Sequence, residues 1–414
     1  MAIGSFARFG RDCPADARTR LARVLFPAFW NEFLFRLNSC RRKSLDPAAA
    51  GYFVVAAGAR AGRSPLLIAR YYAASLINLL LLICRTQKRP EGDGPLFLFT
   101  NLRHGRFFRD GVAPVRAGLY NLRYLRYPHL LAFLSAREIV GGLWLALRTY
   151  PAARDEGRAR CAAEGVDWTV FRRLTLFGRL RYADAVLHAL ALDKHGGEVW
   201  CPGHFDLYVS VLSIAREQGA VRRFVGMQHG LFEYPPAPHA FERLFTDAYH
   251  VLIPESRPWI EAHFLKNPDC EVVIEAREGH IAFQTLERDP GGRVIAFAAQ
   301  EIAPADEALV ERLLAIKARA PMPVEVLLYS HPLYPCENTG WAERGLVSHS
   351  RERHANIDVL ITRFSTLGLD YHRIGVPVLF VPFGDGVCIF DHQDFTVCGD
   401  LDAMEAELAR VLGL

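Results

Sequence analysis

The chain has 414 residues, of which 51% are hydrophobic and 23% charged, and a net charge of +4. This length exceeds one ordinary hydrophobic core and predicts two domains of roughly 200 residues each, in a composition that excludes a fibrous or disordered chain. Nine scattered cysteines without a Cys-x-x-Cys pair argue against a zinc ribbon or a disulfide framework and indicate a reducing cytoplasm.

The charge is divided unevenly along the chain. Residues 1–200 carry 31 Lys and Arg against 15 Asp and Glu, whereas residues 201–414 carry 18 against 30. Arginines between positions 103 and 126 alternate with aromatic and aliphatic side chains, a pattern that suits an interface between water and lipid. No nucleic-acid-binding motif accompanies them, so no nucleic acid is expected. The first half therefore predicts contact with an anionic membrane surface, with an ordinary solvated face as the alternative.

Residues 1–90 are expected to be helical and amphipathic. Their most apolar stretch is Tyr71–Cys84, whose fourteen residues would make a helix of about 21 Å against roughly 30 Å of bilayer hydrocarbon. We therefore predict a buried core helix, with a helix in the membrane interface as the alternative. Charged residues interrupt the first twelve positions, so no export signal is expected. The predicted location is the cytoplasm, peripheral to the inner membrane face through the basic half.

Short apolar runs predict the next elements. We expect a strand at Leu96–Thr100, a mainly helical stretch over 115–195, and strands alternating with helices after that. The expected strands are Glu198–Cys201, Phe224–Met227, Tyr249–Ile253 and Val272–Ala276, with a helix near 205–218 and another that begins at Ser256.

A polar stretch, Arg277–Gly292, is the predicted linker. Residues 1–284 are then an N-terminal domain, helical and basic before it becomes α/β, and residues 285–414 a C-terminal α/β domain whose last helix crosses back to the first. The expected C-terminal elements are strands at Val294–Ala298, Val324–Tyr329, Ile357–Thr362 and Val378–Val381 and helices at Pro304–Ala320, Ser365–Ile374 and Asp400–Leu412. Strands separated by helices predict parallel, doubly wound sheets, in which ligands lie beyond the carboxyl ends of the strands.

The first polar strand end is Gln228-His229-Gly230, directly after an apolar strand. Gly230 permits a sharp turn that would leave the His229 imidazole at the edge of the sheet. A histidine there suits the role of general base toward an acceptor hydroxyl. Glu233 is the alternative proton acceptor, and a histidine that only satisfies local backbone groups is the structural alternative.

Two further strand ends predict a phosphate site. Ser330-His331-Pro332 follows the second strand of the C-terminal domain, and Pro332 restricts His331 to extended geometry, from which its imidazole can donate to a phosphate. Ser365 and Thr366 lie between a strand and a helix, with Ser365 expected as the N-cap and Thr366 at the first helical position. Hydroxyls and unpaired backbone N–H groups at a helix start attract anions, although Ser365 could merely cap its own helix.

Other chemistries have weaker support. Asp391-His392-Gln393-Asp394 has the residue types of metal ligands but no partner set, and neither a metal nor a cofactor is expected. A Gly-x-Gly-x-x-Gly fingerprint and a Walker loop are absent, which argues against dinucleotide or ATP chemistry. The Gly-x-Ser-x-Gly turn of hydrolases is absent as well.

In this order, the three strand ends resemble bacterial surface-polysaccharide glycosyltransferases of the GT-B fold, which has two Rossmann-like domains facing a cleft. The His331-Pro332 and Ser365-Thr366 motifs are similar to the phosphate-binding motifs of CMP-sugar users, such as sialyltransferases and capsule Kdo transferases. The segment 358–382 also resembles CDP-glycerol glycerophosphotransferases, which carry Trp-His-Gly where this chain has Gln228-His229-Gly230. The resemblance covers roughly residues 198–414.

The resemblance implies a metal-independent transferase. It would move a sugar from a nucleotide-linked donor, CMP-linked in preference, to a surface polysaccharide or a lipid-linked glycan acceptor. Transfer of a polyol phosphate from CDP-glycerol or CDP-ribitol is the alternative enzyme. A non-catalytic partner that binds glycan or nucleotide in an assembly complex is the alternative from another class.

Overall fold

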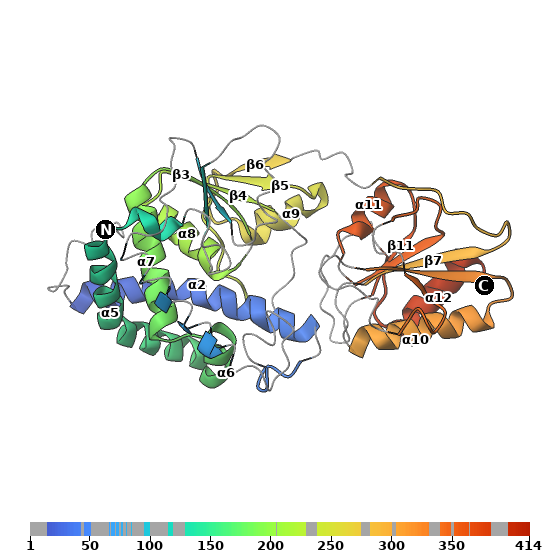
Figure 1. Cartoon of the computed structure of the whole chain (residues 1–414), viewed down its shortest axis with the longest axis horizontal. Helices are drawn as coiled ribbons and strands as arrows, with labels where there is room; N and C mark the ends of the chain where they lie inside the picture. Colours follow the sequence, from blue (N-terminus) through green and yellow to red (C-terminus); the bar gives the residue numbers. More distant parts are fainter. Residues whose placement is uncertain are drawn as a thin grey trace. The chain divides into compact units, whose positions relative to one another are not determined.

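The computed structural model divides the chain into two compact units, each described here by itself (Figure 1). The first holds most of the described residues through Ile274, and the second holds those from Ala282 onward; Asn38–Asp46 group with the second. The described residues are 15–42, 45–50, 66, 68–70, 72–73, 76–77, 80, 84, 95–99, 115–118, 129–203, 205–228, 238–274, 282–299, 304–330, 340–348, 352–363, 365–381 and 396–414.

The described strands of the first unit form one parallel sheet in the order β2-β1-β3-β4-β5-β6. Numbered within the sheet, this is 2-1-3-4-5-6. The chain adds β2 on one side of β1 and all later strands on the other side, so the strand order reverses between the neighbouring strands β1 and β3. Its strands are β1 (Leu96–Phe99), β2 (Val115–Gly118), β3 (Glu198–Pro202), β4 (Arg223–Met227), β5 (Ala248–Val251) and β6 (Glu271–Ile274).

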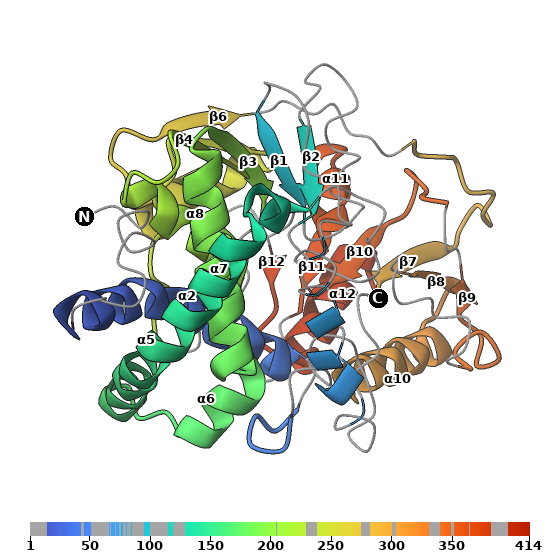
Figure 2. The ribbon, with the colours of Figure 1, turned by 60° about the vertical axis from the view of Figure 1, so that its left-hand side comes forward.

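Helices accompany this sheet, and Figure 2 shows the long ones lying close together. They are α2 (Ala15–Arg42), η5 (Leu130–Phe133), α5 (Ala136–Ala163), α6 (Trp168–Thr175), α7 (Arg179–His195), α8 (Leu207–Glu217), η6 (Pro254–Ser256), α9 (Arg257–Trp259) and η7 (Ile260–Phe264). A capping box starts α5, because Ser135 Oγ accepts from the Glu138 backbone N–H while the Glu138 carboxylate accepts from Ser135 N.

A buried aromatic cluster joins the helices of the first unit. Phe171 of α6 lies 5.6 Å from Phe26 and 5.3 Å from Phe33 of α2, measured between ring centroids. A buried ion pair, Arg181 Nη2 to Glu32 Oε1 at 2.8 Å, ties α7 to the same helix. Removal of either partner would leave a buried charge, so the pair fixes the register of α2 against α7.

The described strands of the second unit form a parallel sheet in the order β12-β11-β10-β7-β8-β9. Numbered within the sheet and read from the β9 edge, this is 3-2-1-4-5-6, the strand order of doubly wound Rossmann sheets. The strands are β7 (Arg293–Ala298), β8 (Val324–Tyr329), β9 (Val347–Ser348), β10 (Val359–Thr362), β11 (Val378–Phe380) and β12 (Thr396–Val397).

Helices cover both faces of the second sheet (Figure 1). One face packs on α10 (Pro304–Arg319) and α12 (Leu401–Leu412), and the other on α11 (Leu367–Arg373). Met404, Leu408 and Leu412 of α12 are buried in the core of this unit. The expectation that the last helix crosses back to the first domain is therefore wrong, because its apolar stripe is already buried against its own sheet.

Three predicted features differ from the structure. Val115–Gly118 is a strand that pairs with β1, although the region was expected to be helical. In the apolar stretch Tyr71–Cys84, the described residues Leu76 and Leu80 are 49% and 60% exposed, so these positions do not form the predicted buried core helix. The predicted linker is also too long, since Gln284 already pairs with Arg353 and Ala355 of the second unit.

Candidate functional site

The second sheet has a topological switch point between the neighbouring strands β7 and β10. The chain leaves β7 for α10 on one face and leaves β10 for α11 on the other. Connections that diverge in this way open a crevice at the carboxyl ends of the two strands, where doubly wound sheets bind nucleotides. Arg363, Ser365 and Thr366 follow the carboxyl end of β10, next to this switch point.

The helix start at the switch point lies one residue later than predicted. Thr366 is the N-cap, and Ser365 precedes it. The buried Ser365 hydroxyl accepts from Leu367 N at 3.2 Å, and Ser365 N donates to Thr362 Oγ1 at 3.0 Å. Thr366 is exposed and its hydroxyl makes no capping bond. Ser365 thus shapes the turn, while Thr366 presents the accessible hydroxyl.

A buried ion pair lies next to the switch point. Arg363 Nε donates to Asp306 Oδ1 at 2.5 Å, and both side chains are almost fully buried. Arg363 Nη1 also donates to the carbonyl of Val381 at 3.2 Å, after β11. The pair therefore joins the first turn of α10 to the ends of β10 and β11, and it fixes the spacing of the elements that border the switch point.

A buried polar network lies at the end of β8, beside Ser330. The hydroxyls of Tyr329 and Tyr371 are 3.0 Å apart, and both accept from the backbone N–H of His354, at 3.2 and 3.1 Å. Burial raises the pKa of both phenols, which stay neutral. The Arg353 guanidinium lies over the Tyr329 ring, 4.6 Å from its centroid, and Nη2 donates to the Ser330 carbonyl at 3.5 Å.

The contact with this network explains why Ser330 is buried at the end of β8. The serine is buried, and its carbonyl faces a guanidinium whose pKa is lowered by burial. Arg353 and His354 are not among the predicted site residues, because they lie in a segment without a strand or helix pattern. Their signal in the sequence is limited to the Arg-Glu-Arg-His run before β10.

Several predicted site residues lie outside the described residues, namely His229, Gly230, Glu233, His331, Pro332 and the run Asp391–Asp394. The strands that precede the two histidines, β4 and β8, end where the sequence predicts. Within the described ranges, no group of three or more His, Cys, Asp or Glu side chains could hold a metal ion.

Gln228 is described, and its side chain is buried. The side chain accepts from the backbone N–H groups of Leu252 and Ile253, both at 3.0 Å, and donates to Ser256 Oγ at 2.9 Å. These hydrogen bonds involve both the oxygen and the nitrogen of the side-chain amide, and they connect the end of β4 to the turn after β5. Gln228 is a predicted candidate for the site, and both its amide oxygen and its amide nitrogen already form hydrogen bonds within the first unit.

Sequence analysis missed a carboxylate at the carboxyl end of β3. Asp206 caps α8, where Oδ1 accepts from Tyr208 N at 3.0 Å and from Val209 N at 3.2 Å. Burial raises the pKa of its carboxyl to about 6, although both bonds oppose this shift. Asp206 lies beside the point where the order of the first sheet reverses, which makes it a second candidate proton acceptor.

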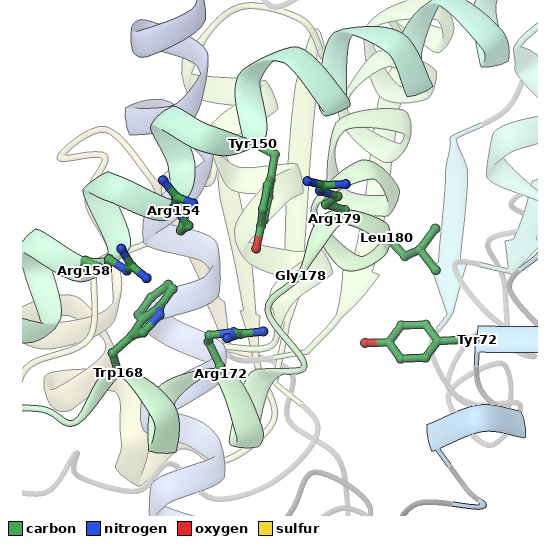
Figure 3. A pocket seen from close by; sticks show the side chains of 9 residues that line it. All are labelled: Tyr72, Tyr150, Arg154, Arg158, Trp168, Arg172, Gly178, Arg179 and Leu180. Atoms are coloured by element: carbon green, nitrogen blue, oxygen red, sulfur yellow. The ribbon is translucent and has the colours of Figure 1, made fainter.

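The first unit also has a basic pocket of about 490 Å³ (Figure 3). Arg154 and Arg158 come from α5, Arg172 from α6 and Arg179 from the first turn of α7. The remaining lining residues are Tyr72, Tyr150, Trp168, Gly178 and Leu180. None of the lining residues that the structure describes is acidic.

The sequence did carry a signal for this pocket. Tyr150, Arg154 and Arg158 are four residues apart on α5, so they share one face of the helix. The remaining arginines come from other helices, and only the packing of α5, α6 and α7 brings them together. None of the helices that the structure describes combines the length and the apolar character needed to cross a bilayer.

Comparisons with known proteins give distant structural likenesses. No protein-family model matches the sequence, and no curated protein matches it. A co-structure of MnaA from S. aureus with UDP aligns with 54% of this chain and 70% of its own, at 13% identity and a TM-score of 0.34. A crystal structure of TarM aligns with 58% of this chain and 53% of its own, at 10% identity and a TM-score of 0.33. At these TM-scores the likeness carries no weight for function.

Proposed function

We propose that this protein is a glycosyltransferase that moves a sugar from a nucleotide-linked donor to a surface-glycan or lipid-linked acceptor. The observation that carries the proposal is the strand order 3-2-1-4-5-6 of the second sheet, with Ser365 and Thr366 at its switch point. The second unit is the donor domain in this proposal, and the first unit is the acceptor side of a GT-B enzyme.

The donor phosphates bind at the start of α11 in this proposal. The Thr366 hydroxyl is exposed there, and the Ser365 hydroxyl already orders the turn. His331, the second residue after β8 in the sequence, supplies a charge-assisted donor in this proposal. A CMP-linked donor is preferred, because the motifs around Ser365 and His331 resemble those of CMP-sugar users.

The transfer step needs a base and a stabilised leaving group. A base takes the proton of the acceptor hydroxyl while its oxygen attacks the anomeric carbon, and the bond from that carbon to the nucleotide phosphate breaks. His229 is assigned this role, with Asp206 and Glu233 as the alternatives. Donors at the switch point stabilise the charge that develops on the departing phosphate.

A nucleotide screen tests the donor site. We expect one of CMP, CDP, UDP or GDP to raise the unfolding temperature, because a ligand at 100 times its Kd adds about 2.7 kcal/mol to the unfolding free energy. Ser365→Ala, Thr366→Val and His331→Ala should each raise the Kd of that nucleotide by about tenfold or more. Thr396→Val, an exposed threonine of the same unit, is the matched control.

The outcomes separate the alternatives. Release of free nucleotide from a CMP-sugar supports the transferase, whereas release from CDP-glycerol or CDP-ribitol supports the polyol-phosphate alternative. Nucleotide binding without any turnover points to a non-catalytic partner. If no nucleotide shifts the unfolding temperature, or if the three variants bind like the control, the donor site is wrong.

A further inference from the structure

The basic pocket of the first unit concentrates positive charge, and of its four arginines only Arg154 has an ion-pair partner among the described carboxylates. Arg158, Arg172 and Arg179 form no ion pair with any described carboxylate, and Arg154 pairs with the exposed Asp155 at 3.0 Å. Four guanidinium groups around one hollow repel one another, and an anion in the hollow relieves that repulsion. The pocket is thus electrostatically suited to a multiply charged anion.

The geometry of the donors fits a phosphoryl group. The guanidiniums approach the hollow from three helices, and the hydroxyls of Tyr72 and Tyr150 point toward it (Figure 3). Guanidinium forks match phosphate oxygens, and several forks from different directions suit a tetrahedral group better than a planar carboxylate. Burial raises the pKa of the Tyr72 phenol, which keeps it a neutral donor.

The start of α7 adds to this field. Gly178 is its N-cap and lines the pocket, so the first backbone N–H groups of a 17-residue helix have no side-chain cap. The first turn carries no acidic residue, and the positive end of the helix dipole therefore remains uncompensated. Arg158 stacks on Trp168, with the guanidinium 6.0 Å from the ring centroid, which holds one cation at the rim.

An apolar stripe begins at the same pocket. Tyr72, Leu76 and Leu80 each have helical backbone and follow one another at intervals of four residues, the spacing of side chains on one face of a helix. Tyr72 lines the pocket, whereas Leu76 and Leu80 are largely exposed. A phosphate on a soluble molecule would not need this stripe, but a phosphate on a lipid would bury it.

We propose that the basic pocket binds the phosphoryl or pyrophosphoryl group of a lipid-linked ligand, whose apolar chain lies along Leu76 and Leu80. The further assignment of this ligand as the transferase acceptor rests on the proposed function. The binding itself does not, because it needs no nucleotide and no turnover.

Two probes test the proposal, both without nucleotide. Inorganic pyrophosphate tests the pocket by calorimetry, and sedimentation with phosphatidylcholine vesicles, with or without phosphatidic acid, tests the lipid. We expect the double variant Arg158→Gln/Arg172→Gln to raise the Kd of pyrophosphate at least tenfold and to weaken binding to the phosphatidic acid vesicles. The matched control is Arg137→Gln/Arg222→Gln, which removes the same charge from exposed positions outside the pocket and should change neither.

A second pair of substitutions separates the apolar stripe from the pocket. Leu76→Ser/Leu80→Ser should weaken vesicle binding and leave pyrophosphate binding unchanged, because these side chains are exposed and do not line the pocket. Pyrophosphate binding without phosphatidic acid binding would overturn the lipid assignment. Equal loss of binding in the control variant, or no pyrophosphate binding at all, would overturn the pocket. Nucleotide binding, measured separately on the same variants, reports on the proposed function.

Discussion

Polar side chains at the strand ends are of two kinds. Some already form hydrogen bonds within the protein, and others remain exposed. The Gln228 amide is used at both ends, and the Ser365 hydroxyl accepts a bond from its own helix start. Thr366, one residue further, is exposed. Sequence position alone does not show which polar side chains are available to a ligand. A polar residue after a strand can bond to a neighbouring loop, cap a helix or bind a ligand, according to which backbone groups lie near it.

The role assigned to His229 gives a sharp prediction. His229→Ala should lower kcat by at least 10² while the Kd of the nucleotide stays within a few-fold of wild type, because a general base acts in the chemical step and not in donor binding. Single-turnover kinetics and calorimetry measure the two quantities. An unchanged kcat would transfer the role to Asp206 or Glu233, and lost nucleotide binding would place His229 in the donor site.

Asp206 predicts a specific dependence of stability on pH. Its carboxyl has a pKa of about 6 in the folded protein against 3.8 as the ordinary value, so folding favours the protonated form. As the pH rises from about 3 to 7, through both pKa values, this group alone lowers the unfolding free energy by roughly 3 kcal/mol. Asp206→Asn keeps an oxygen for the cap and should remove this loss. Parallel pH profiles of denaturant midpoints for the two proteins would contradict the raised pKa.

Among secondary structure elements, long apolar runs were predictable and short polar ones were not. The strands β3, β4, β7 and β8 lie within one or two residues of their predictions, because each is a buried apolar run between turn residues. The sequence did not predict β9 and β12, which have two residues each, or β2, whose Val-Arg-Ala-Gly lacks an apolar pattern. Their strand structure comes from pairing with neighbouring strands.

The predicted burial failed at the described positions Leu76 and Leu80 for a different reason. An uncharged apolar run is equally compatible with a protein core and with a lipid-facing surface, and composition does not separate the two. The basic pocket was missed because its arginines come from three helices and converge only through tertiary packing. The helix start at Thr366, by contrast, was predicted to within one residue, since a strand followed by Ser-Thr is a local signal.

The close approach of α11 to its sheet can be tested at Gly368. A Cβ atom there would lie 2.7 Å from Phe380 Cζ and 3.3 Å from methyl groups of Thr362 and Val378. Gly368→Ala should therefore lower the unfolding free energy by about 1–3 kcal/mol and weaken nucleotide binding, because the helix start moves away from β10. Gly399→Ala, in the same unit with open space around the added methyl, is the control. Equal denaturant midpoints for the two variants would contradict this packing.

Across the whole molecule, the excess of basic residues and the doubly wound sheet lie in different halves of the chain. The first 200 residues carry the excess of Lys and Arg, and the pocket arginines belong to them. The second unit carries the doubly wound sheet with its switch point, in the acidic half of the chain. An anionic nucleotide would thus bind at local donors within an acidic half, whereas an anionic surface or acceptor would be attracted by the net field of the basic half.

This distribution predicts membrane association that depends on salt. If the basic half contacts anionic lipid, the fraction of protein that sediments with phosphatidic acid vesicles should fall steeply as the salt concentration rises from low to physiological. Exposed charges are screened over about 8–10 Å under physiological conditions, so the long-range attraction is lost first. Binding that remains at physiological salt should depend on Leu76 and Leu80, because burial of apolar surface is not screened. Equal sedimentation with neutral and anionic vesicles at low salt would contradict an electrostatic mode, since the two vesicles differ in charge.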